Sequence, residues 1–303
     1  MAVTVTQLVA FLAVARRGSV TAAARELVVT QPSVSAAIGA LQRELGVTLM
    51  QRDGRSLRPT RAGEAYLPYA THVLGLLDQG ARAARDAASG AAATLRLGAV
   101  TTAGEHLVAP LLRSFREAHP ELEITLQVGN RGETLQRLLD REVDLAITGR
   151  VPPELPFTAR PFAANPFLLI TAASDPLAGA HDVALEELGT RPWLLREPGS
   201  GTRTLCEEYL ARHGLNPRIL TLGSNGAIRQ AVGLGLGVAL QSQCAVALEL
   251  ELGRLATVAV REALPRRAWH ITHPQVGPVS GPAVAFVEFL GSRAAAQAIQ
   301  PPG

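Results

Sequence analysis

The fold of the N-terminal region is decided by one segment, Ser19-Val-Thr-Ala-Ala-Ala-Arg-Glu-Leu27-Val-Val-Thr30-Gln-Pro-Ser-Val-Ser35. Ser19 and Thr30 are favourable N-cap residues, so the segment predicts one helix over about 19–27 and a second over about 31–44. Pro32 is tolerated in the first turn of the second helix, because the amides there have no helical partner. Two helices joined by so short a turn are typical of a helix-turn-helix, whose second helix presents Gln31, Ser33 and Ser35 near its N-terminus.

Apolar spacing extends this module in both directions. A preceding helix is expected at about 4–17, because four apolar residues fall on one face: Leu8, Phe11, Leu12 and Ala15. The second helix of the segment carries its own stripe: Val34, Ile38, Leu41 and Leu45. Gly46 suits the position after its C-terminus. The polar segment Gln51-Arg-Asp-Gly-Arg-Ser-Leu-Arg58 then predicts a β-hairpin wing.

The positive charge of the chain is concentrated in this module. The 303 residues carry a net charge of +3, and all 29 basic residues are arginine. Residues 1–65 hold eight arginines and four acidic residues, whereas the rest of the chain is close to neutral. A compact basic module joined to a neutral body favours binding to a phosphate backbone, although a solvated helical surface would carry the same charge.

These residues resemble the DNA-binding domain of LysR-type transcriptional regulators. The similarity runs in order through Phe11-Leu-Ala-Val-Ala-Arg-Arg-Gly-Ser19, the segment quoted above, Leu45-Gly46 and Thr60-Arg-Ala-Gly63. It implies that Gln31, Pro32 and Ser35 face base edges of double-stranded DNA, while Thr30 and Ser33 dock the helix. Arg52, Arg55 and Arg58 of the wing would hold phosphates or enter a minor groove. The alternative for these arginines is a solvated turn.

Three positions depart from the family pattern. Gln42 replaces a usual glutamate, and Met50 stands where phenylalanine is common. Both positions are expected to serve packing or capping, so these two changes matter little. The third departure, Ala36-Ala37, lacks the frequent basic residue, so the resemblance does not support a base or phosphate contact at position 36.

A long helix is expected over about 61–90. Apolar residues recur at three- and four-residue spacing, namely Leu67, Ala70, Leu74, Leu77, Ala81 and Ala84. This stripe is too long to be buried against a 60-residue module alone, although packing within the same chain remains the alternative. The family resemblance implies a linker helix that pairs two subunits and places two recognition helices on an interrupted palindrome. It also implies a tetramer and contact with RNA polymerase.

From Thr94 onward, predicted strands alternate with predicted helices. The pattern indicates an α/β body with parallel sheets covered by helices, and ligands at the carboxyl ends of the strands. It resembles the LysR effector domain, which has the two-lobed fold of periplasmic solute-binding proteins. The expected organisation is a winged helix-turn-helix over 1–60, a linker helix over 61–90 and an effector domain over 91–303. Lobe I would comprise about 94–164 and 274–298, and lobe II about 165–273.

The most informative part of the body is Pro198-Gly-Ser-Gly-Thr202. Two glycines allow close approach of the backbone, and a helix that begins here offers free amides and hydroxyls to an anion. Thr101 and Thr102, before another helix, would face it from the other lobe. Arg131, Arg203 and Arg229 are candidate counter-charges. The predicted effector-binding residues are Thr101, Thr102, Asn130, Arg131, Gly199, Ser200, Gly201, Thr202, Arg203 and Asn225.

Several phrases of the body narrow the resemblance to one branch. Val128-Gly-Asn-Arg131, Asn165-Pro166 and Leu195-Arg-Glu-Pro-Gly-Ser-Gly-Thr-Arg203 are similar to the Calvin-cycle branch, the CbbR-type activators of carbon-fixation operons. Regulators of sulfur assimilation in the same family carry similar phrases and remain an alternative. The resemblance implies a small anionic effector, either a phosphorylated metabolite or NADPH, and no permanently bound cofactor.

The chain lacks the patterns of a membrane protein, a disulfide-rich protein or an enzyme. No apolar run reaches the about 18–20 residues that span a bilayer, and Arg16 and Arg17 follow the apolar N-terminal stretch instead of preceding it, unlike a secretory signal. We therefore expect a cytoplasmic protein. Cys206 and Cys244 are too few for a disulfide framework and are expected to be buried. His270 and His273 lack the carboxylate neighbours of a metal site.

Two glycine-rich stretches also fail as catalytic motifs. Pro198 stands where a nucleophile elbow around Ser200 would need a glycine. Gly233-Leu-Gly-Leu-Gly237 follows a helix and precedes a strand, the reverse of a dinucleotide-binding motif. A ligand-responsive transcription regulator is therefore the first hypothesis. A periplasmic solute receptor and an enzyme that uses the interlobe cleft are the alternatives.

Overall fold

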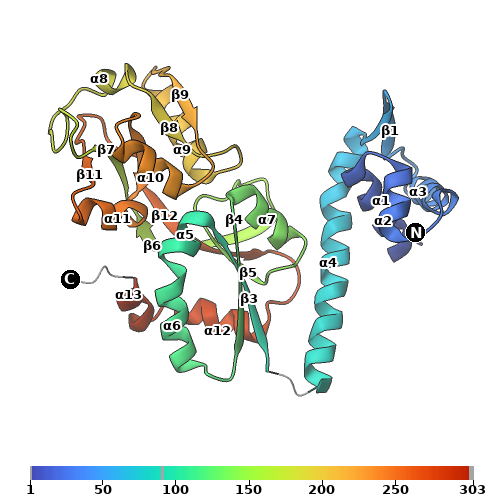
Figure 1. The fold of residues 1–303 in the computed structure, drawn as a ribbon. Coiled ribbons are helices and arrows are strands. Elements are labelled where there is room, and N and C mark those ends of the chain that lie inside the picture. The colour runs from blue at the N-terminus through green and yellow to red at the C-terminus, as the bar shows by residue number, and fades with distance from the viewer. Residues whose placement is uncertain (1, 90–91, 300–303) are drawn as a thin grey trace. The chain divides into compact units, whose positions relative to one another are not determined.

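The structure is a computed structural model that describes residues 2–89 and 92–299 (Figure 1). The chain divides into a smaller unit, built from the first 91 residues, and a larger unit, built from almost all of the rest. Each unit has its own hydrophobic core. The two units are described separately below.

The smaller unit begins with three helices and a hairpin, as the sequence predicts. Its elements are α1 (Val5–Arg17), α2 (Val20–Leu27), α3 (Gln31–Leu45), β1 (Met50–Asp53), β2 (Ser56–Pro59) and α4 (Arg61–Ser89). The predicted caps are present: the Ser19 hydroxyl accepts from the Ala22 amide, and the Thr30 hydroxyl accepts from the Ser33 amide. These local hydrogen bonds explain why the predicted helix boundaries agree with the structure to within about one residue.

Side chains and backbone groups tie the wing to the helices. Gln42 Oε1 accepts hydrogen bonds from the amides of Leu49, at 2.7 Å, and Met50, at 3.1 Å. The Leu57 amide donates to the carbonyl of Gly18 at 2.8 Å. Gln42 therefore performs the capping role expected of it, because an amide oxygen accepts from backbone amides as a carboxylate would.

The apolar stripe of α4 has two parts. Ala70 is buried, and Leu67 and Leu74 pack beside it against the core of the helix-turn-helix. A second row, Tyr69, Val73 and Leu77, follows four-residue spacing and is exposed, with Tyr69 at 70% and Leu77 at 51%. The expected single stripe is therefore corrected: its first half is buried within the same chain, while a neighbouring row is left uncovered.

The larger unit contains two lobes (Figure 1). Lobe I is built on a five-stranded sheet in the order β4-β3-β5-β12-β6. Its strands are β3 (Thr94–Val100), β4 (Glu123–Gly129), β5 (Leu145–Thr148), β6 (Phe157–Asn165) and β12 (Arg267–Pro274). Its helices are α5 (Thr101–His106), α6 (Val108–Ala118), α7 (Arg131–Leu139), α12 (Gly281–Phe289) and α13 (Arg293–Ala298). Phe115 and Phe286 meet edge to face at 5.0 Å in the core of this lobe.

Lobe II has smaller sheets. β10-β7-β11 form one sheet and β8-β9 another, and an isolated bridge joins Trp193 to Val238. The strands are β7 (Phe167–Ala172), β8 (Trp193–Leu195), β9 (Ile219–Thr221), β10 (Ala239–Ser242) and β11 (Leu255–Thr257). The helices are α8 (Leu185–Gly189), α9 (Gly201–Arg212), α10 (Asn225–Gly233) and α11 (Gln243–Glu251). Gly237 packs so closely on Pro192 that an added Cβ would lie 2.2 Å from its carbonyl oxygen, which explains the glycine-rich stretch as a close-packed turn.

The structure corrects three expectations for the body. The two larger sheets are not parallel: the five-stranded sheet is mixed, because β12 runs antiparallel to β5 and β6, and the β10-β7-β11 sheet is antiparallel throughout. The helix expected over about 105–118 is divided at Leu107 into α5 and α6. The return to lobe I occurs at Arg267 and not near residue 274, because β12 pairs along its whole length with β6.

Strand β6 was not among the expected strands. It contains Pro161, and much of the strand is exposed. Pro161 pairs with His270 next to a register irregularity in β12. Proline is accepted on an edge strand and at a bulge, where no ladder hydrogen bond is lost. The edge strand then continues through Asn165 and Pro166 directly into β7, which is one of the two connections between the lobes.

Candidate functional site

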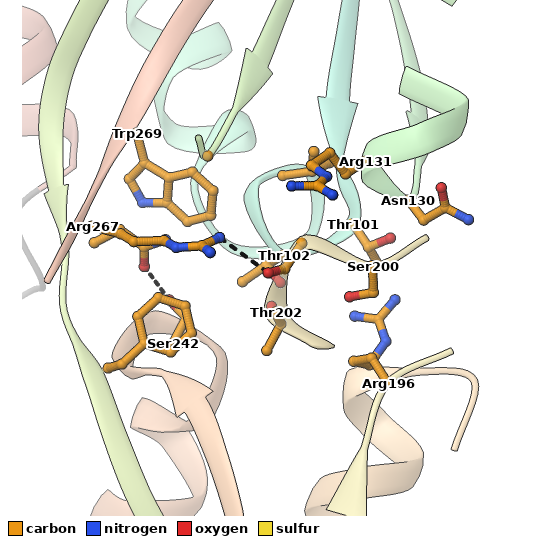
Figure 2. Close-up of a pocket in the computed structure, with 15 residues that line it drawn as sticks. Thr101, Thr102, Asn130, Arg131, Arg196, Ser200, Thr202, Ser242, Arg267 and Trp269 are labelled. Carbon is orange, nitrogen blue, oxygen red and sulfur yellow. Dashed lines mark hydrogen bonds between the residues drawn. The ribbon is translucent and has the colours of Figure 1, made fainter. Parts of the chain in front are cut away.

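A small cavity lies between the two lobes (Figure 2). Its volume is about 40 Å³, enough for a few water molecules. Side chains of lobe I, including Arg131 and Trp269, enter from one side, while Arg196, Thr202 and Ser242 of lobe II enter from the other. The lobes therefore enclose a polar space of limited size at the ends of their strands, where ligands of α/β proteins bind.

Three arginines surround this cavity. Arg196 is only 3% exposed, and its guanidinium binds both carboxylate oxygens of Glu197 and, at 2.6 Å, the side-chain oxygen of Asn225. Arg131 donates to the Thr204 hydroxyl at 3.5 Å, and Arg267 donates to the carbonyl of Gly201 at 3.0 Å. None of the fifteen residues that line the cavity is Asp or Glu.

Arg267 is partly buried close to other positive charges. Burial lowers the pKa of its guanidinium, and the positive charges of Arg131 and Arg150 act in the same direction, against the opposing effect of Glu208. Its bond to Gly201 joins lobe I to the first residue of α9 in lobe II. An anion placed beside Arg267 would relieve this repulsion, because an opposite charge favours the charged form of the group.

Hydroxyl and amide groups complete the lining. Ser200 is buried and is the N-cap of α9, yet its hydroxyl makes no capping hydrogen bond. Asn130 caps α7 by accepting from the Glu133 amide at 3.0 Å, and Thr101 donates to the Gly129 carbonyl at 3.1 Å. Two helix N-termini, those of α7 and α9, therefore begin at the cavity and offer positive dipole ends to a ligand.

Asn225 links the lobes behind the cavity. It is fully buried in lobe II, and its side-chain nitrogen lies 3.2 Å from the Thr102 hydroxyl and 3.1 Å from a carboxylate oxygen of Glu105, both in lobe I. Its oxygen accepts from Arg196. The Gly132 amide also donates to the Gly199 carbonyl at 3.4 Å across the same interface. The closed arrangement of the lobes is thus held by direct hydrogen bonds.

The structure separates the predicted effector residues into two groups. The cavity is lined by Thr101, Thr102, Asn130, Arg131, Ser200, Gly201 and Thr202. Gly199, Arg203 and Asn225 lie outside the lining. Gly199 instead allows the loop to turn, because its φ of +87° favours glycine. Asn225 forms the hydrogen bonds that link the two lobes.

Arg203, one of the expected effector-binding residues, does not line the cavity. It binds Glu207 four residues further along α9 at 2.8 Å, the carbonyl of Arg196 at 3.0 Å and the Thr221 hydroxyl at 3.1 Å. One step along a helix turns a side chain by about 100°, so Arg203 leaves the face that Thr202 presents to the cavity. Arg229 is likewise turned away and pairs with Glu249 at 2.7 Å.

Sequence reasoning missed several lining residues. They are Val100, Gly149, Asn165, Phe167, Arg196, Ser242, Arg267 and Trp269. Asn165 and Arg196 belong to the sequence phrases that resemble the Calvin-cycle branch, so those phrases could have indicated both residues as part of the site. Nothing local marks Arg267, since it reaches the cavity only because β12 crosses back to lobe I.

The recognition helix presents the predicted DNA-contacting residues to solvent. Gln31, Pro32, Ser33 and Ser35 are all exposed, and Val34 between them is buried. The Thr30 and Ser33 hydroxyls lie 2.8 Å apart and hold the first turn of α3. Val28, in the turn before α3, is 89% exposed and has a φ of +56°, an uncommon conformation for a β-branched residue.

The three wing arginines are exposed on the hairpin. Arg58 forms an ion pair with Asp53. Arg52 lies opposite Leu57 in the register, and Arg55 follows Gly54 at the tip, where φ is +59°. A cross-strand ion pair between exposed groups costs little to break, so Arg58 stays available to a phosphate.

No group of three His, Cys, Asp or Glu residues suited to a metal occurs within residues 2–89 and 92–299. None of the described helices is both long and apolar enough to cross a membrane. Cys206 is buried as expected, and burial raises the pKa of its thiol to about 12. Cys244 is only partly buried, and burial raises the pKa of its thiol too.

A winged helix-turn-helix with an exposed recognition helix, joined to a two-lobed ligand-binding domain, defines a ligand-responsive transcriptional regulator. Residues 5–64 match the model of the bacterial regulatory helix-turn-helix proteins of the LysR family, and residues 88–295 match the LysR substrate binding domain. The chain therefore belongs to the LysR family of DNA-binding transcriptional regulators.

Its relatives include regulators of carbon fixation. The chain is 37% identical to the HTH-type transcriptional regulator CfxR of Cupriavidus necator, over 96% of this chain and 94% of the relative. It is 33% identical to the RuBisCO operon transcriptional regulator of Allochromatium vinosum, over 97% and 98% of the two chains. The regulatory domain of Synechocystis PCC6803 CcmR in complex with 2-PG is 31% identical and covers 65% of this chain and 95% of its own, with a TM-score of 0.62.

Proposed function

We propose that this regulator controls a carbon-fixation operon in response to a small anionic metabolite that binds the interlobe cavity. The observation that carries the proposal is the lining of that cavity. Arg131 and Arg267 face it without an ion-pair partner among the described residues, two helix N-termini begin there, and no lining residue is acidic. The names of the relatives favour carbon fixation over sulfur assimilation.

A phosphorylated carboxylate is the favoured ligand. The related CcmR regulatory domain is described in complex with 2-PG. A compact anion of this kind has two charged ends, which would suit Arg131 and Arg267 and the start of α9. A cavity of about 40 Å³ must widen to admit either kind of ligand, and NADPH, which is much the larger, would need the lobes to separate further than a phosphorylated carboxylate would.

The interlobe hydrogen bonds supply a switching mechanism. A ligand that bridges Arg267 of lobe I and the Ser200 loop of lobe II would compete with, or add to, the contacts made by Asn225 and Gly201. It would therefore have different affinities for open and closed lobes, which is the requirement for a population shift. In a DNA-bound oligomer, the new lobe arrangement would alter the spacing of the DNA-binding units and the bend of the promoter.

The DNA-binding role is assigned to Thr30, Gln31, Pro32, Ser33 and Ser35 of the recognition helix and to Arg52, Arg55 and Arg58 of the wing. Exposed polar side chains at the start of α3 support base contacts, and exposed arginines on the hairpin support phosphate or minor-groove contacts. The protein would act in the cytoplasm, where the operator lies.

The proposed assembly is a dimer through α4, doubled to a tetramer. The uncovered row of Tyr69, Val73 and Leu77 supports pairing of two linker helices, because an exposed apolar face of this length is stabilised by a partner. Two paired recognition helices would read an interrupted palindrome, and an activator at such a site would contact RNA polymerase.

The test is DNase footprinting of the full-length protein on the intergenic DNA upstream of its own gene. The titrations include 2-phosphoglycolate, 2-phosphoglycerate, phosphoenolpyruvate and NADPH. We expect a protected interrupted palindrome whose extent changes with one phosphorylated carboxylate. Gln31→Ala should weaken specific binding about 5- to 150-fold, whereas Gln297→Ala, an exposed glutamine in α13, should not. Unchanged protection with every compound would refute the proposed effector class.

A further inference from the structure

A second cavity, of about 400 Å³, adjoins the interlobe cavity described above, which is called the effector cavity from here on because an effector is proposed to bind it. The two cavities differ in the charge of their linings. It also lies between the lobes: His106, Leu107 and Pro110 line it from lobe I, and Gln243, Cys244 and Ala247 line it from lobe II. Asn165, Ser242 and Trp269 line both cavities. The two spaces are thus neighbours that share one wall, and the second is about ten times larger.

The lining of the second cavity carries no formal charge. Among the described residues that form it, none is Asp, Glu, Arg or Lys. Most of its surface is apolar and comes from alanines, Leu107, Pro110, Ile299 and the Trp269 ring. An anion would find no counter-charge here, in contrast to the effector cavity with its arginines.

One polar group in this lining has no hydrogen-bond partner. Nε2 of His106 is buried and makes no hydrogen bond to a described residue, and the closest carboxylate oxygen, from Glu105, lies 3.6 Å away. Burial lowers the pKa of His106, and the positive charge of Arg229 acts in the same direction, while Glu105 and Glu249 oppose it. The lowered pKa favours the neutral imidazole, whose two ring nitrogens are one hydrogen-bond donor and one acceptor.

We propose that this second cavity is a binding site for a small, neutral, mainly apolar molecule that carries one hydrogen-bonding group, such as an aromatic alcohol. Charge complementarity carries the choice, since an uncharged apolar lining favours an uncharged apolar ligand. Its volume is in the range of small-molecule pockets. His106 is the residue that would orient the polar end of the ligand.

The shared wall couples the two sites. The Ser242 hydroxyl donates to the side-chain oxygen of Asn165 at 2.5 Å, and both residues face the two cavities. Because each cavity is lined by both lobes, a ligand in either one acts on the same lobe arrangement. Binding at one site should change the affinity at the other by the same factor in both directions. This coupling rests on the proposed function, whereas the binding itself does not.

The experiment is equilibrium dialysis of the full-length protein with 2-naphthol. We expect saturable binding of one molecule per chain. Ala247→Phe should weaken it at least tenfold, because Ala247 is an exposed lining residue of α11 whose enlargement obstructs the cavity. Ala211→Phe, an exposed alanine of α9 away from the cavity, is the matched control and should bind as the wild type does. Equal melting temperatures of the two variants would establish that both are folded.

A second variant tests the role of His106. We expect the wild type to bind 2-naphthol about 3- to 10-fold more tightly than naphthalene, and His106→Leu to lose this preference while it still binds both compounds. Unsaturable uptake of 2-naphthol, or uptake that Ala247→Phe leaves unchanged, would overturn the proposed site. If 2-phosphoglycolate binds but its affinity is the same with and without saturating 2-naphthol, the coupling is wrong. A protein that binds 2-naphthol but no phosphorylated carboxylate would contradict the proposed function alone.

Discussion

Replacing Arg267 with methionine provides the sharpest test of the effector cavity. The sequence offers Arg203, together with Arg131 and Arg229, as a candidate counter-charge. The structure instead turns Arg203 toward Glu207 and brings Arg267 to the cavity from the other lobe. We therefore expect Arg267→Met to lose binding of 2-phosphoglycolate and Arg203→Met to retain it.

The magnitude follows from the contacts of each guanidinium. A hydrogen bond to a charged group contributes about 1.5–3 kcal/mol, so Arg267→Met should weaken binding about 12- to 150-fold. Its folding cost should stay below about 1 kcal/mol, because Arg267 makes one hydrogen bond, to Gly201, and lies beside the repelling charges of Arg131 and Arg150. Arg203→Met removes hydrogen bonds to three partners and should destabilise lobe II by about 1–3 kcal/mol.

The assay is isothermal titration calorimetry of each full-length variant with 2-phosphoglycolate, combined with thermal unfolding in the absence of ligand. We expect a crossed pattern: weak binding with a near-normal melting temperature for Arg267→Met, and binding within about threefold of wild type with a reduced melting temperature for Arg203→Met. Wild-type affinity in Arg267→Met together with lost affinity in Arg203→Met would refute the placement of the anion site.

Three further substitutions test other parts of the structure. Gly63→Ala should lower the free energy of unfolding by about 1–3 kcal/mol, measured by calorimetric melting, because the added Cβ would lie 2.1 Å from the Leu49 carbonyl oxygen. The control Gly39→Ala, in α3, should be neutral or stabilising. Equal melting temperatures of the two variants would contradict this prediction. Val28→Asn should raise the free energy of unfolding by about 0.5–1 kcal/mol, since asparagine tolerates the positive φ of this exposed turn better than valine does. Urea unfolding measures the change, and a loss of stability would show that the backbone conformation of Val28 is not strained. Asn225→Leu should weaken 2-phosphoglycolate binding about 5- to 50-fold by removing the interlobe hydrogen bonds, and unchanged calorimetric affinity would show that closure does not depend on them.

The DNA-binding unit and the order of the domains could be predicted from the sequence, because the signals there are local. Ser19 and Thr30 cap helices through hydrogen bonds that reach only three residues along the chain. The spacing of Val34, Ile38 and Leu41 determines which face of α3 is buried, and Gln31 and Ser35 are exposed as a consequence. The loop before α9, whose residues Ser200, Gly201 and Thr202 line the cavity, could be predicted for the same reason, since a helix N-terminus with small residues is marked in one short segment.

The complete effector cavity was decided only by the tertiary structure. Arg267 is 136 residues away from Arg131 in the sequence, and the two meet because β12 crosses back to pair with β5 and β6 in lobe I. Arg203 is excluded by the direction in which α9 turns it, and Asn225 becomes an interlobe link because Thr102 and Glu105 pack opposite it. Local hydrogen bonds and apolar spacing are encoded in consecutive residues, whereas the composition of a cavity depends on which distant strands pair, and that pairing has no local signature.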